Sequence, residues 1–103
     1  MPKMIVKKHS TPDKMLVLAV CDKELLGKRF ENQEAQLDLT TEFYKGEEMS
    51  KEQVTALMKK AYIVNMVGEN AIKSGIEADI VSKSNIIRIK NIPHAQVLLS
   101  RNE

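Results

Sequence analysis

The chain has 103 residues, of which 43% are hydrophobic and 29% are charged, and its net charge is +2. This composition excludes a disordered chain, and the length is typical of one domain, so we expect a single domain over residues 1–103. The longest apolar runs, 15–21 and 61–67, are far shorter than the about 20 residues that span a membrane. The single cysteine, Cys21, and the lack of a leader pattern indicate a cytoplasmic protein.

The charges are segregated along the chain. Residues 1–29 carry seven basic and three acidic groups, whereas residues 30–57 carry two basic and seven acidic groups. Residues 82–103 carry four basic groups and one acidic group, so if the two ends of the chain pair in one sheet, their charges form one basic face. The side chains that we expect to contact nucleic-acid phosphates are Lys7, Lys8, Arg88, Lys90 and Arg101. Alternatively, these side chains are solvated and bind no partner.

The first third of the chain predicts antiparallel strands. Residues 3–9 and 15–21 form a predicted hairpin, and the second strand is expected to be central because it is apolar on both faces. Asp22 then caps a single helical turn. Two short strands, 28–31 and 35–39, follow around a polar turn.

Two helices are predicted in the centre of the chain. Ser50 and Gln53 match the capping-box pattern, and apolar residues at helical spacing predict a helix over about 51–66. Gly68 is expected to break the pattern. A second helix is predicted over about 69–78.

The C-terminal part predicts two more strands, 86–90 and 94–99, joined by a turn at 91–93. Residues 100–103 are expected to form a frayed tail. The sequence therefore predicts an α+β fold, with N-terminal antiparallel strands, two central helices and C-terminal strands.

Three polar residues stand out as candidates for a binding or catalytic site. Asn65 lies on the apolar stripe of the predicted helix, where its amide needs a partner from the backbone or from a ligand. His94 follows Pro93 directly, and an imidazole can serve as an acid, a base or a ligand. Glu69 lies four residues after Asn65 and either caps the second helix or shares its face.

Other reactive side chains carry weaker signals. Cys21 could act as a nucleophile with His94, although a thiol at the end of a buried strand is usually an ordinary core residue. His9 is expected to be solvated and Phe43 to pack at the edge of the core. With two histidines and one cysteine at no ligand spacing, we expect no metal site, and we expect no cofactor.

Four blocks of sequence resemble one protein family. The blocks DKELLGKRF (22–30), FYKGEE (43–48), NMVGENAI (65–72) and NIPHAQV (91–97) are similar, in that order, to small archaeal proteins known as domain of unknown function 424. The resemblance implies a compact α+β fold in an archaeal cytoplasm and no established activity.

The family pattern falls on particular residues of this chain. Where the family tends to have small residues or glycine, this chain has Lys90-Asn91 before the Pro-His-Ala block and Asp79 after the second helix. The residues that match the pattern are Asp22, Leu26, Gly27, Phe43, Tyr44, Gly46, Asn65, Gly68, Glu69, Pro93, His94, Ala95 and Gln96. Among them, the polar side chains of Asp22, Asn65, Glu69, His94 and Gln96 are the candidate ligand- or partner-binding residues.

Three functions are compatible with these observations. The first is a non-enzymatic binding module for RNA or a ribosome-associated protein, with phosphate contacts from the basic ends. The second is a small enzyme or metabolite-binding protein, with a polar pocket formed by Asp22, Asn65, Glu69 and His94. The third is a structural subunit of a protein complex. A membrane partner is not expected.

Overall fold

The computed structural model describes residues 3–99. Its centre is a mixed six-stranded sheet with the strand order β5-β1-β2-β6-β8-β7, and β3 and β4 form a separate two-stranded sheet. The elements are β1 Met4–Ser10, β2 Leu16–Asp22, η1 Lys23–Leu25, β3 Arg29–Glu31, β4 Gln36–Asp38, η2 Glu42–Tyr44, β5 Glu47–Met49, α1 Lys51–Met58, β6 Ile63–Val67, α2 Glu69–Glu77, η3 Lys83–Asn85, β7 Ile87–Ile89 and β8 Ile92–Leu98.

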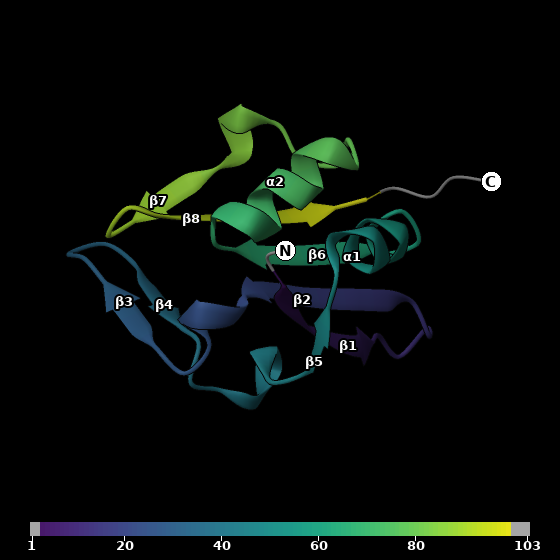
Figure 1. The fold of residues 1–103 in the computed structure, drawn as a ribbon, viewed down its shortest axis with the longest axis horizontal. Helices are drawn as coiled ribbons and strands as arrows, with labels where there is room; N and C mark the ends of the chain where they lie inside the picture. Colours follow the sequence, from purple (N-terminus) through teal and green to yellow (C-terminus); the bar gives the residue numbers. More distant parts are fainter. Residues whose placement is uncertain (1–2, 100–103) are drawn as a thin grey trace.

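The six-stranded sheet separates two hydrophobic clusters. Helices α1 and α2 pack on one face, which we call the helix side (Figure 1). The opposite face is partly covered by η1, η2 and the β3–β4 hairpin, which extends away from the large sheet. Each fully buried Leu, Met or Val side chain contributes about 1.5–3 kcal/mol. The large buried side chains on the helix side are Met4, Val6, Leu18, Val20, Val54, Met58, Val64, Met66 and Ile72.

The structure confirms the α+β fold and the N-terminal hairpin. β1 and β2 pair antiparallel from Met4–Asp22 to Ser10–Leu16, and β2 is buried as a central strand. The capping box at Ser50 is also present, since its hydroxyl accepts a hydrogen bond from the Gln53 N–H and the Gln53 side chain accepts one from the Ser50 N–H. The expected tail, 100–103, lies outside the described residues.

The helix predicted over 51–66 is wrong in its second half. Helix α1 ends at Met58, and the residues after Tyr62 form β6, which pairs parallel with β2 and antiparallel with β8. A central strand covered on both faces is apolar on both faces, so its sequence resembles that of a buried helix. Three of the five residues of β6 are β-branched, and these lose side-chain freedom in a helix.

The last turn lies earlier than predicted, because β8 already begins at Ile92. The reversal is made by Lys90 and Asn91, whose φ angles are +52° and +66°. Two successive positive φ angles are typical of the type I′ turns that close two-residue hairpins. Pro93 therefore lies inside β8, where it pairs with Arg88 and its carbonyl accepts a hydrogen bond from the Gly68 N–H.

Two short elements within residues 40–49 had no counterpart in the prediction. They are η2 and the three-residue strand β5, which pairs with β1 at the edge of the sheet. A strand this short has too few residues to show an alternating pattern. Among residues 3–99, no helix combines the length and the hydrophobicity needed to cross a membrane.

The β7–β8 turn gives a first test. Lysine is strained at a positive φ, whereas asparagine followed by glycine is the preferred pair in this turn. We expect Lys90→Asn combined with Asn91→Gly to raise the free energy of unfolding by about 0.5–1 kcal/mol, measured by urea denaturation. Lys83→Asn, at an exposed position without a positive φ, is the control and should change it less. An unchanged or lower stability of the double variant would contradict the assigned turn.

Candidate functional site

Asp22 joins the end of β2 to the start of α2. The residue is 2% exposed, and its carboxylate accepts hydrogen bonds from the backbone N–H groups of Asn70 (3.0 Å) and Ala71 (2.8 Å). The Asn70 side-chain amide donates a third bond at 3.3 Å. Burial raises the pKa of the carboxyl, and the N–H groups of Asn70 and Ala71 act in the opposite direction. Asp22 thus occupies the helix terminus where an anionic ligand would otherwise bind.

Gly68 makes room for this interaction. Its φ is +108°, and an added Cβ would lie 2.4 Å from the Asp22 Cγ. A side chain at this position would therefore displace the carboxylate from α2. The pair of Asp22 and Gly68 is best explained as the structural junction of β2, β6 and α2.

Asn65, His94 and Gln96 lie on the face of the sheet opposite the helices. Asn65 pairs with Gln96, and Val67, two residues after Asn65, pairs with His94, so the three polar side chains are neighbours on β6 and β8. Asn65 and His94 are half-buried, whereas Gln96 is exposed. Desolvation lowers the pKa of His94, which favours its neutral form.

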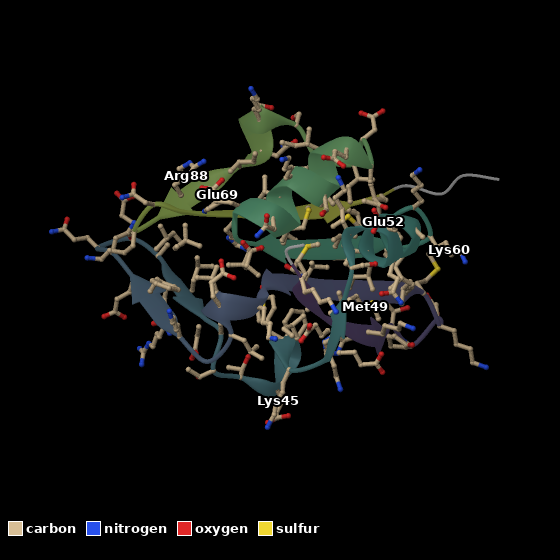
Figure 2. The ribbon with its side chains drawn as sticks, viewed as in Figure 1. Lys45, Met49, Glu52, Lys60, Glu69 and Arg88 are labelled. Atoms are coloured by element: carbon tan, nitrogen blue, oxygen red, sulfur yellow. The ribbon has the colours of Figure 1, made fainter. Side chains whose placement is uncertain are left out.

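Glu69 lies on the helix side with Arg88. Their side chains form an ion pair of 3.0 Å, and Figure 2 shows the two groups next to each other. Both side chains are more than half exposed, at 69% and 54%, so the pair contributes at most about 1 kcal/mol. The pocket predicted from Asp22, Asn65, Glu69 and His94 is therefore not assembled, because the sheet separates the first and third from the other two.

The basic residues are distributed over several surfaces. Lys7 and Lys8 are neighbours on β1, yet Lys7 faces away from the helices and Lys8 lies on the helix side. Arg88 belongs to β7, and Lys90 borders a shallow depression together with Arg29 of the β3–β4 hairpin. Arg101 lies outside the described residues. The two ends of the chain do share one sheet, but β2 and β6 separate β1 from β8.

The β3–β4 hairpin covers only part of the sheet face opposite the helices. We call the remaining part of this face the open face. It consists of two rows of cross-strand neighbours, Lys7–Ala19–Asn65–Gln96 and His9–Val17–Ile63–Leu98, together with the adjoining pair His94–Ile87. These residues include no acidic side chain. The open face thus combines amides, imidazoles and one ammonium group with exposed apolar side chains.

His9 and Phe43 were missed as members of this surface. Their rings stack at a centroid distance of 4.5 Å and an angle of 12°, and the His9 Nε2 lies 2.9 Å from the Phe43 carbonyl oxygen. His9 is therefore not simply solvated, and Phe43 is 37% exposed. The alternation of side chains along β1 could have placed His9 on the same face as Lys7. No sequence pattern, however, indicates where η2, which supplies Phe43, packs against the sheet.

Cys21 does not have the properties of a catalytic nucleophile. Its thiol is buried, and desolvation, with the charges of Asp22 and Glu24, raises its pKa to about 12. A nucleophilic cysteine needs the thiolate form. No group of three or more potential metal ligands occurs among residues 3–99.

The Asp22 junction predicts a large effect of a single substitution. Asp22→Ala leaves the buried Ala71 N–H without its acceptor, so we expect the free energy of unfolding to fall by about 2 kcal/mol or more. Asp13→Ala, in an exposed turn, should change it by less than about 0.5 kcal/mol. Urea denaturation measures both. Equal effects of the two substitutions would show that the junction is not important for stability.

The burial of Cys21 predicts low reactivity and an alkaline loss of stability. In the native state the thiol should not react with a disulfide reagent near neutral pH, whereas it should react after unfolding in urea. The folded-state pKa of about 12 lies above the ordinary value of 9.0. The contribution of the protonated Cys21 thiol to the free energy of unfolding is therefore complete below about pH 9, and it is lost as the pH rises towards about 12. Rapid reaction of the native protein would contradict this burial.

Comparisons with known proteins agree with this architecture. The crystal structure of an uncharacterized conserved protein from Methanopyrus kandleri matches with a TM-score of 0.82 and 25% sequence identity, over 98% of this chain and 96% of that chain. A comparison with curated proteins gives no match. A family model described as "Protein of unknown function (DUF424)" matches residues 9–99. Because this match covers most of the chain, the protein belongs to the DUF424 family.

Proposed function

We propose that the protein is a non-enzymatic RNA-binding module, and that single-stranded RNA lies across the open face. The observation that carries this proposal is the absence of acidic side chains from the rows that contain Lys7, Asn65 and Gln96. Carboxylates would repel phosphates, whereas ammonium groups, amides and imidazoles can all bind RNA.

The open face offers groups for two kinds of contact. Lys7 can bind a phosphate, and the amides of Asn65 and Gln96 can donate to and accept from base edges. Since β1 and β8 are three strand spacings apart, these groups extend over about 14 Å. With four aromatic residues in the chain, amide hydrogen bonds suit base recognition here better than extensive stacking does.

The neighbouring lysines of β1 provide a matched test. We expect Lys7→Gln to weaken binding of a fluorescent single-stranded RNA by about fivefold at about 0.1 M salt, and to reduce the salt slope by about 0.7, as measured by anisotropy. Lys8→Gln removes the same charge from the helix side and should have a smaller effect. Ribosomal and transfer RNA fragments are the first probes.

Two outcomes would reject the proposal. One is the absence of RNA binding at low salt, or a binding affinity that does not change with salt. The other is an equal effect of Lys7→Gln and Lys8→Gln, because a contact made by the open face must distinguish the two sides of β1.

A protein partner is the second candidate, and the exposure of two apolar side chains favours it. Leu98 is 66% exposed and Ile87 is 60% exposed, and both belong to the open face. Ile87 pairs with His94, four residues before Leu98 on β8, so the two side chains offer a protein partner two separate apolar contacts on this face. Purification of the native complex separates the candidates, because copurifying RNA supports the first and a stoichiometric protein without RNA supports the structural-subunit function.

A further inference from the structure

Strand β7 forms an outer edge of the six-stranded sheet (Figure 1). It is the last strand in the order, and among residues 3–99 it pairs with β8 alone. The N–H and C=O of one residue in an antiparallel strand point to the same side of that strand. The Pro93 carbonyl accepts a hydrogen bond from Gly68, next to β6, so Arg88, which pairs with Pro93, directs its N–H and C=O away from β8. The edge therefore presents a backbone donor and acceptor to which no strand is paired.

A groove of about 880 Å³ runs along the helix side of this edge, between α2 and the segment from η3 to β7. We call it the edge groove. The apolar part of its lining comes from Ile72, Ile76 and Ile86, and Ile76 is 41% exposed. On the other face of the sheet, Ile87 of the same edge is 60% exposed. Apolar side chains thus flank the edge of β7 on both faces.

The charges of the edge groove leave a positive excess. Its two carboxylates are already paired, Glu69 with Arg88 at 3.0 Å and Glu77 with the lysine that begins α1 at 2.9 Å. Lys73 of α2 and Lys83 of η3 also belong to the lining, and neither has a carboxylate within 4.0 Å among residues 3–99. Two ammonium groups, one from each wall, are therefore available to an acidic ligand.

An extended peptide matches the backbone, the apolar side chains and the charges of this edge. As an additional strand beside β7 it forms main-chain hydrogen bonds with Arg88, and its side chains alternate between the two faces of the sheet. Carboxylates on the helix side can reach Lys73 and Lys83, and apolar side chains on the other face lie beside Ile87. A second copy of this chain, paired through Arg88 of both copies, would place two guanidinium groups directly opposite each other, which is unfavourable.

We propose that the outer edge of β7 binds an extended peptide of a partner protein, in which acidic side chains alternate with apolar ones. The peptide adds a strand to the sheet, its carboxylates bind Lys73 and Lys83, and its apolar side chains contact Ile87. The site does not depend on RNA binding, because Lys7 belongs to β1, and β2, β6 and β8 lie between β1 and β7.

The test uses the full chain and two synthetic heptapeptides with blocked ends, one of alternating glutamate and valine and one of alternating lysine and valine. In ¹H–¹⁵N NMR titrations the acidic peptide should perturb the amides of residues 86–89, and it should slow hydrogen exchange of the Arg88 amide. We expect the lysine peptide to bind at least about tenfold more weakly, because like charges repel each other across an interface.

Methylated peptides test the main-chain hydrogen bonds. A residue directly opposite Arg88 has its side chain on the helix side, so the glutamates of the peptide direct their N–H groups to β7. Methylation of the glutamate backbone nitrogens should weaken binding by about fivefold or more. Methylation of the valine backbone nitrogens, which face away from β7, is the matched control and should have a smaller effect.

Variants of the protein provide the complementary test. Arg88→Pro and Arg88→Gln remove the same charge, but only proline also removes the outward N–H, and an edge strand tolerates proline at such a position. We expect Arg88→Pro to weaken peptide binding by about fivefold more than Arg88→Gln. Lys83→Gln should weaken it by about threefold. Lys60→Gln, at the opposite end of the molecule from Arg88 (Figure 2), and Lys7→Gln should change it less.

Four outcomes overturn the proposal. They are an unprotected Arg88 amide in the presence of the acidic peptide, equal binding of the acidic and lysine peptides, equal effects of methylating glutamates and valines, and equal effects of Lys83→Gln and Lys60→Gln. Protection of the Arg88 amide in a dimer without peptide, detected by sedimentation, would assign the edge to a second copy instead. Thermal unfolding shows whether each variant retains the fold, and the methylated peptides test the unmodified chain.

Discussion

The hydrogen bonds from the start of α2 to the Asp22 carboxylate are the interaction on which the rest of the structure depends. They connect the end of β2 to the chain that leaves β6, and these two strands form the parallel pair in the centre of the sheet. The carboxyl ends of parallel strands are where many α/β proteins bind an anionic ligand. Here the chain supplies its own anion, so this edge of the sheet is closed to an anionic ligand.

The sheet itself decides which polar residues can act together. Asp22 and Glu69 belong to the helix side, whereas Asn65 and His94 belong to the opposite face, although Asn65 and Glu69 are only four residues apart in the chain. Gly68 lies between them, where the backbone turns from strand to helix. A polar site built from both groups would have to pass through the packed sheet. The two faces are therefore separate surfaces, and polar residues of one face cannot join a site on the other.

Much of the fold was predictable because its signals are local. The capping box at Ser50 and the uninterrupted apolar strand β2 each depend on neighbouring residues alone. The strand β6 could not be predicted, because a strand buried on both faces and a buried helix both show apolar residues without interruption. In a buried helix the Asn65 amide would be costly. On the strand β6, however, Asn65 is only half-buried and belongs to the open face.

The candidate surfaces were harder to predict than the fold. The stack of His9 on Phe43 and the cavity between the starts of β1, α1 and α2 both bring together segments that are distant in sequence. No sequence motif marks either of them, because tertiary packing positions the loops that take part, such as the one that carries η2. The polar trio of Asn65, His94 and Gln96 could be named as candidates from the sequence, but their arrangement required the strand register.

The alternation of side chains along β1 fixes the face of the sheet on which each lysine of this strand lies. Met4 and Val6 point into the helix-side core. Lys8 therefore points to the same side as these two residues, and Lys7 points to the opposite side. A slip of one residue between β1 and β2 would move both lysines to the opposite faces, but it would also expose the two core side chains. The register is thus held by the core. The buried side chains of Met4 and Val6 thus determine which charges the open face presents.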